Sequence, residues 1–231
     1  MKTLRVIVPA VLLSVCAFAQ AAGTGVSREV ADFQGVEVGG GLKARVTVGP
    51  KAVRVTGDEK LVALVRTEVV DGKLEVGLER GSWWRGTSGL RVHISSPQVT
   101  SVGASGGAEV EAEATATDTF TASASGGGEV SVRNVEAKKL TVEASGGAEV
   151  KLKGRADTLK VEASGGAEVH GEELGLKALE VEASGGAQVD ANPSERIVAQ
   201  LSGGSSVHVD SAPAQREVSS SGGARVVFRK Q

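Results

Sequence analysis

The sequence predicts an all-β fold: a single-stranded parallel β-helix, or β-solenoid, with about 20 residues per coil. Three observations predict it. A Ser-Gly-Gly turn recurs at a nearly constant spacing, the residues between turns alternate between apolar and polar, and equivalent apolar positions align from copy to copy. The handedness that parallel crossovers normally adopt predicts a right-handed coil.

The Ser-Gly-Gly turn occurs seven times, with its first glycine at positions 106, 126, 146, 165, 185, 203 and 222. The steps between copies are 20, 20, 19, 20, 18 and 19 residues. A period this regular brings equivalent positions into register on successive coils. We expect the glycines to form the corner of each coil, because they permit backbone angles that a side chain disfavours.

Strands are predicted on both sides of each turn, because apolar and polar residues alternate there with a period of two. Aligning the copies gives three inward-facing columns: Phe120, Leu140, Leu159, Leu179, Ile197; Val102, Ala122, Val142, Val161, Val181, Ala199, Val218; and Val110, Val130, Val150, Val169, Val189, Val207, Val226. Stacked about 4.8 Å apart, these columns fill a narrow core. Such a core needs few large rings, which fits four Phe, two Trp and no Tyr.

A meander of β-hairpins is the rival arrangement. A two-residue Gly-Gly hairpin would pair Ala144 with Glu149, an inward position with an outward one. Including Ser145 in the loop corrects the faces but places Glu143 opposite Glu149, two like charges. The nearly constant period favours the solenoid.

Residues 22–103 lack the turn motif but keep the alternation. We expect them to form irregular first coils that cap one end of the solenoid, before regular coils over 104–231 whose tail, 225–231, forms the opposite cap. Gly- and Pro-containing turns separate the expected strands. These strands are 33–38, 42–48, 53–56, 61–67, 73–78, 90–94 and 99–102.

The first 21 residues have the features of a secretory signal peptide. Lys2 and Arg5 precede an apolar run over 6–19, and Ala19-Gln20-Ala21 offers a small-x-small cleavage site. We therefore expect an exported chain, periplasmic or at the cell surface, without a transmembrane segment after cleavage. The single cysteine, Cys16, lies in the signal, so the mature chain is expected to lack disulfides.

Charge and motif content limit the possible functions. Removing the signal changes the net charge from −2 to −4, so no basic field is left to attract nucleic acid. A polysaccharide-active enzyme of the pectin-lyase type is the catalytic alternative, but it needs an irregular cluster of carboxylates and a base. The carboxylates here form regular rows. We therefore expect a non-catalytic chain without a cofactor, a monomer or a weak oligomer.

Two rows of glutamates flank the corner. Glu109, Glu129, Glu149 and Glu168 follow the turn, and Glu143, Glu162 and Glu182 precede it. A solvated face that keeps the solenoid soluble explains both rows. The alternative is a weak site for Ca²⁺ or cationic polymers, because hard cations favour clustered carboxylates.

Another outward column reads Glu111, Ser131, Lys151, His170, Asp190 and His208. The two histidines bracket Asp190 but lie two rungs apart, about 9.6 Å by strand spacing. That separation is too large for one metal ion, so we expect exposed polar side chains here.

The sequence Trp83-Trp84, flanked by Arg80 and Arg85, interrupts the alternation in a loop rich in Gly and Ser. Adjacent indoles can stack on sugar rings or anchor a protein partner. This loop is therefore the candidate binding site for a glycan or for an envelope or surface protein. The alternative is that both rings fold back onto the side of the solenoid.

The chain resembles the family described as "putative auto-transporter adhesin, head GIN domain". The resemblance is carried by Val30-Ala-Asp-Phe-Gln-Gly-Val-Glu-Val38, Val69-Val-Asp-Gly-Lys-Leu-Glu-Val76, Leu90-Arg-Val-His-Ile-Ser-Ser-Pro97 and the glycine-rich turns. The family more often has Gly-Ser-Gly where this chain has Ser-Gly-Gly. The resemblance implies a β-helix, export, an adhesion or envelope role, and no established catalytic residues.

Overall fold

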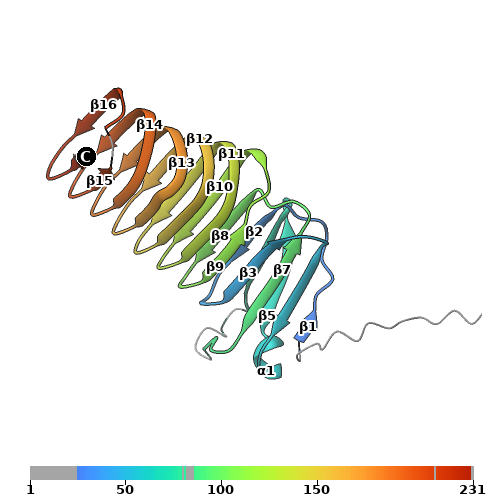
Figure 1. Cartoon of the computed structure of the whole chain (residues 1–231). Helices are drawn as coiled ribbons and strands as arrows, with labels where there is room; N and C mark the ends of the chain where they lie inside the picture. Colours follow the sequence, from blue (N-terminus) through green and yellow to red (C-terminus); the bar gives the residue numbers. More distant parts are fainter. Residues whose placement is uncertain (1–24, 80, 82–85, 211, 230–231) are drawn as a thin grey trace, which may run out of the picture.

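The computed structural model describes residues 25–79, 81, 86–210 and 212–229 (Figure 1). The fold is all-β, with 2% helix, 66% strand and a β-solenoid of about six turns. Over these described residues, 17 strands form one continuous hydrogen-bonded sheet. The predicted fold class is therefore confirmed, whereas the predicted signal peptide lies outside the described residues.

The regular part of the solenoid begins at β8 and ends at β17 (Figure 1). All of its strand pairs are parallel, and each coil before the last pairs with the coils on both sides of it. A hairpin meander would instead give antiparallel pairs across each turn. The strands are β8 (Ser101–Ser105), β9 (Glu109–Glu113), β10 (Thr117–Ser125), β11 (Glu129–Ser145), β12 (Glu149–Ala163), β13 (Glu168–Ala183), β14 (Gln188–Leu201), β15 (Ser206–Val209), β16 (Gln215–Ser220) and β17 (Arg225–Phe228).

The three predicted columns form much of the core of the regular coils. In the first, Leu140 pairs with Leu159 and Leu159 with Leu179, and all three side chains are fully buried. The other two columns are also in register from coil to coil. Burial decreases at the C-terminal end, where Val218 on β16 is 44% exposed.

The Ser-Gly-Gly corner depends on the first glycine of each copy, which has a φ between 57° and 74° in all seven copies. Side chains are disfavoured in this left-handed region. In the later copies the corners themselves are hydrogen-bonded: the N–H of Gly186 donates to the carbonyl oxygen of Gly165 at 2.6 Å, for example. The corners therefore stack as closely as the strands do.

The N-terminal region differs from a simple succession of coils. β2 (Gly35–Val38) and β3 (Lys43–Val48) pair in parallel with β8 and β9 on one side, and with β6 (Lys73–Leu78) and β7 (Arg91–Ser96) on the other. The coil of β6 and β7 thus lies outside the coil that precedes it in the chain. Three antiparallel pairings complete this end: β5 (Val65–Val70) with β6, β4 (Ala52–Thr56) with β7, and β1 (Gly25–Ser27) with β4.

A short helix, α1 (Glu59–Val62), occupies the start of the segment 61–67 that we expected to be a strand. That expectation is wrong for its first residues, and β5 begins only at Val65. The physical reason is the N-cap: the Asp58 carboxylate accepts hydrogen bonds from the backbone N–H groups of Lys60 and Leu61.

The tail continues the sheet. β17 pairs in parallel with β15, and the Arg216 guanidinium lies 5.5 Å from the centre of the Phe228 ring. Every residue of β16 is exposed. Among the described residues, no further strand pairs with the outer edges of β16 and β17.

Candidate functional site

A polar groove follows the solenoid on the side that precedes the Ser-Gly-Gly corner. Two hollows that share Glu162 and Ser164 form it, and they extend from Glu37 at one end to Ser219 at the other. We call it the acid–serine groove. Its polar lining is Glu37, Ser123, Ser125, Glu143, Ser145, Glu162, Ser164, Glu182, Ser184, Gln200, Ser202 and Ser219.

The register of the strands positions this lining. Glu143 pairs with Glu162, and Glu162 with Glu182, so that the predicted row forms with one carboxylate per rung. The alanine after each glutamate is buried in the core, and the serine after that faces the groove. The alternation Glu-Ala-Ser therefore places a row of carboxylates beside a row of hydroxyls.

Two carboxylates of the groove have no ion-pair partner among the described residues. Lys160 donates a hydrogen bond to Glu162 at 2.5 Å, whereas Glu143 and Glu182 form no ion pair or hydrogen bond with any described side chain. At the N-terminal end, partial burial raises the pKa of the Glu37 carboxyl, with Lys73 opposing the shift and Glu75 adding to it. Free carboxylates suit ligands that offer hydrogen-bond donors or positive charge.

The second predicted row, Glu109, Glu129, Glu149 and Glu168, is also in register. It differs because the chain supplies cations to it. Lys43 pairs with Glu109, and Lys151 Nζ lies 2.8 Å from Glu149 and 2.9 Å from Glu129. Hydrogen bonds to these two glutamates raise the pKa of Lys151 to about 12. Cation binding by either row stays a prediction.

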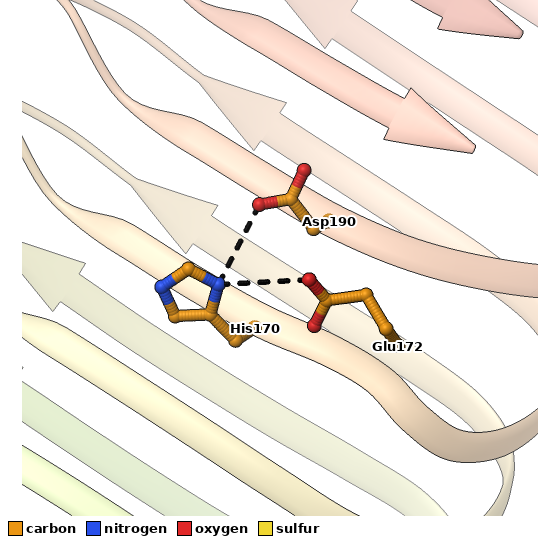
Figure 2. A group of neighbouring side chains, drawn as sticks. All are labelled: His170, Glu172 and Asp190. Carbon is orange, nitrogen blue, oxygen red and sulfur yellow. Dashed lines mark ion pairs between the residues drawn. The ribbon is translucent and has the colours of Figure 1, made fainter. Parts of the chain in front are cut away.

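A cluster of one histidine and two carboxylates lies on the outer surface of β13 and β14 (Figure 2). His170 Nδ1 is 3.5 Å from Asp190 Oδ2 and 3.7 Å from Glu172 Oε1. One potential ligand atom from each residue lies within 4.8 Å of the other two. Strand register brings His170 beside Asp190, and Glu172 faces outward two residues further along β13.

Asp190 is only 7% exposed, so the prediction of an exposed polar column is wrong at this position. Its neighbours cover it: Gln188 Nε2 donates to Asp190 Oδ2 at 2.9 Å, and the buried Nδ1 of His208 lies 3.0 Å from Oδ1. The His208 ring is not aligned for a hydrogen bond to that oxygen. Glu172 belongs to the next outward column on β13, so the column from Glu111 to His208 does not predict it.

The tryptophan-loop prediction, with Arg80, Trp83, Trp84 and Arg85, lies outside the described residues. It stays a prediction.

A family model matches residues 32–213, most of the chain, and its description is "Putative auto-transporter adhesin, head GIN domain". The chain belongs to this family. The resemblance found in the sequence is therefore confirmed. No curated protein matches this head GIN domain.

Solved structures share the fold of this head GIN domain. A "putative adhesin" from Bacteroides fragilis is 21% identical, with a TM-score of 0.82 over 90% of this chain and 97% of that one. A "putative adhesin" from Parabacteroides merdae is 18% identical, with a TM-score of 0.67 over 88% and 94% of the two chains. A "putative lipid binding protein" from Parabacteroides distasonis is 14% identical, with a TM-score of 0.64 over 88% and 96%. At these identities the likeness shows the fold alone.

The family and these neighbours are named as adhesins or binding proteins rather than as enzymes. Within the described residues of this head GIN domain, no helix has the length and hydrophobicity needed to span a membrane.

Proposed function

We propose that this head GIN domain is an exported, non-catalytic binding module whose acid–serine groove holds an extended, hydroxyl-rich or cationic polymer of the envelope or of another cell surface. The observation that carries the proposal is the pair of unpaired carboxylates, Glu143 and Glu182, in a groove that continues over successive coils. Sugar hydroxyls donate to carboxylates and accept from serine hydroxyls. A glycan is therefore the ligand class that this lining fits.

The form of the groove favours an extended ligand over a compact one. Its carboxylates and hydroxyls repeat once per rung, about every 4.8 Å, so several equivalent contacts are available along one direction. Each contact is exposed and individually weak, but contacts in series on one polymer add through effective concentration. Such a surface suits adhesion, in which many weak contacts hold a long partner.

The same lining argues against glycoside hydrolysis and against lipid binding. Glu162 and Glu182 are one rung apart, near the separation of about 5–5.5 Å in retaining glycosidases. However, such enzymes place their two carboxyls in different environments, and these glutamates are both exposed in equivalent positions. The acyl chain of a lipid would need an apolar lining, whereas serines, glutamates and a glutamine line this groove.

A glycan array with matched charge variants tests the proposal. We expect the untagged chain to be retained on a subset of glycans or on a cationic polymer such as chitosan. The triple variant Glu143→Gln, Glu162→Gln, Glu182→Gln should lose at least about tenfold in affinity, as expected for several charged hydrogen bonds. The control removes the same charge beyond the corner, with Glu109→Gln, Glu129→Gln and Glu149→Gln. Equal losses in both triples, or no retention of the parent chain, would refute the groove assignment.

The tryptophan loop is a second proposed contact, supported by the sequence alone. Trp83→Ala combined with Trp84→Ala should reduce glycan retention and leave the melting temperature unchanged. Unchanged retention would remove the loop from the proposed binding surface.

Surface display is tested separately by protease treatment of intact cells. Loss of the chain from intact cells would support adhesion to an external partner. Protection until the outer envelope is permeabilised would restrict the binding role to the periplasm.

A further inference from the structure

His170 is surrounded by carboxylates without being hydrogen-bonded to any of them. Its Nδ1 faces Asp190 Oδ2 at 3.5 Å and Glu172 Oε1 at 3.7 Å (Figure 2). On the opposite side of the ring, Nε2 faces Glu149 Oε1 at 3.5 Å and Glu168 Oε2 at 3.6 Å. All four distances exceed the usual 2.7–3.2 Å range of an N–H···O hydrogen bond, about 0.3 Å or more beyond it. Space is therefore left between the imidazole and the carboxylates.

We propose that His170 Nδ1, Glu172 and Asp190 bind one divalent first-row transition-metal ion, for which Zn²⁺ is the test ion. Zinc binds imidazole nitrogen and carboxylate oxygen at about 2.0–2.2 Å, so neighbouring ligands on a tetrahedron lie about 3.3–3.6 Å apart. The two distances from Nδ1, 3.5 and 3.7 Å, agree with such edges to about 0.1 Å. The third pair lies within 4.8 Å, and rotation of the exposed Glu172 side chain can shorten it.

The surroundings of His170 resemble the outer shell of a metal site. A metal-bound histidine normally donates its other ring N–H to a carboxylate, which orients the ring. Glu149 and Glu168 occupy that position beside Nε2, from two adjacent coils of the solenoid. The row of Glu109, Glu129, Glu149 and Glu168 thus supplies two positioning carboxylates beside Nε2.

Asp190 supplies the independent argument for a cation. Its side chain is nine-tenths buried, and a buried carboxylate requires compensation by positive charge and hydrogen bonds. Gln188 Nε2 gives Oδ2 one neutral hydrogen bond at 2.9 Å, and His208 Nδ1 lies 3.0 Å from Oδ1 without a hydrogen bond to it. No Lys or Arg among the described residues forms an ion pair with Asp190. A metal ion between Asp190 and His170 would give this carboxylate a positive partner.

The ligand chemistry selects the class of ion. An imidazole favours zinc and its first-row neighbours, whereas Ca²⁺ takes six to eight oxygen ligands. Three protein ligands, of which only Glu172 is exposed, leave the fourth position to water or to a donor group of a partner. The site follows the Ser-Gly-Gly corner, whereas the acid–serine groove precedes it, so the inference does not depend on the proposed function.

Isothermal titration of the purified, untagged chain with Zn²⁺, after treatment with a chelator, tests the inference. We expect one ion per chain and a melting temperature that rises when Zn²⁺ is added. His170→Ala should abolish both effects, and His93→Ala, which removes a histidine elsewhere, should change neither. No saturable binding, or an unchanged isotherm in His170→Ala, would overturn the assignment.

Neighbouring glutamates give a second, matched comparison. Glu172→Gln should weaken Zn²⁺ binding at least about tenfold, while Glu173→Gln, whose carboxylate pairs instead with Lys153 at 2.7 Å, should leave it unchanged. Glu168→Gln should weaken binding about 10- to 100-fold by removing a positioning carboxylate. Because these side chains are exposed, the variants should remain folded. Equal effects of Glu172→Gln and Glu173→Gln, or displacement of Zn²⁺ by an equal concentration of Ca²⁺, would indicate diffuse binding to acidic residues and refute the site.

Discussion

Substitution of Gly185 by alanine tests the corner geometry on which the solenoid depends. Gly185 has a φ of 72°, and a Cβ atom built there would lie 2.9 Å from the carbonyl oxygen of Gly165 on the preceding coil. Gly186, the next residue, lies outside the left-handed region, and its Cβ would lie 3.5 Å from the same oxygen, an ordinary contact. The two substitutions add the same methyl group to one turn but differ in strain.

The expected loss of stability comes from two sources. An alanine in the left-handed conformation costs about 1–2 kcal/mol. The close contact would also displace the carbonyl of Gly165, which accepts a hydrogen bond from Gly186 N–H at 2.6 Å, and weakening this bond costs about 1 kcal/mol. Gly185→Ala should therefore destabilise the chain by about 2–3 kcal/mol, whereas Gly186→Ala should stay within about 0.5 kcal/mol of the parent.

Urea and thermal denaturation, each followed by circular dichroism, measure the stability of both variants. At about 2–4 °C per kcal/mol for a chain of this size, Gly185→Ala should lower the melting temperature by roughly 5–10 °C. The denaturant slope should stay unchanged if the solenoid still unfolds cooperatively. Equal stability of the two variants would refute the argument that backbone conformation and contact between coils require glycine at this corner.

Three further predictions address the core, the groove and the surface charges. Leu159→Ala, in a fully buried column, should cost about 2–5 kcal/mol in chemical denaturation, whereas Val218→Ala, in a 44% exposed position, should cost under about 1 kcal/mol; similar losses would contradict the assigned core. Burial raises the pKa of Glu37 in the folded state, so its ionisation opposes folding above that pKa and has no effect below the unfolded value of about 4.3. Glu37→Gln should therefore raise the melting temperature at about pH 7 but not at about pH 3. Stabilisation at the lower pH alone would refute a raised pKa for Glu37. Lys151→Gln should cost under about 1 kcal/mol and lose its effect at high salt, since its ion pairs are exposed; a larger, salt-independent loss would show that they are structural.

The regular coils could be predicted from the sequence because one signal repeats seven times. Alignment of the copies defines each inward column, such as the one through Leu140 and Leu159. In the folded chain these aligned positions stack directly on one another. The same information predicts both glutamate rows. The constant period predicts parallel pairing between coils, because a hairpin meander does not require equal spacing between its turns.

The N-terminal end could not be predicted in the same way, because nothing there repeats. A short apolar segment such as 61–67 fits a strand or a helix equally well by its pattern, and the Asp58 cap stabilises a helical turn at its start. The sequence also does not reveal that the coil of β6 and β7 lies outside that of β2 and β3, since strand order depends on contacts between distant segments.

The metal cluster was missed for a geometric reason. Along the solenoid axis, one column contains His170 and His208, which lie too far apart to share an ion. The cluster extends in two directions from His170. Asp190 lies one rung away along the solenoid axis, and Glu172 lies two residues further along the same strand. The pattern His-x-Glu on one strand, with an acid in register on the next, would have identified it.

The in-register stacking of the corners has a consequence for how such proteins evolve. Each regular coil pairs only with adjacent coils, and Ser-Gly-Gly followed, after two further residues, by an inward valine recurs in all seven copies. A tandem duplication or deletion of one copy in the gene therefore inserts or removes a complete layer without requiring a new core. Each such event changes the length of the protein by about 4.8 Å. Recombination between copies can thus change the length of the molecule in uniform steps of one coil.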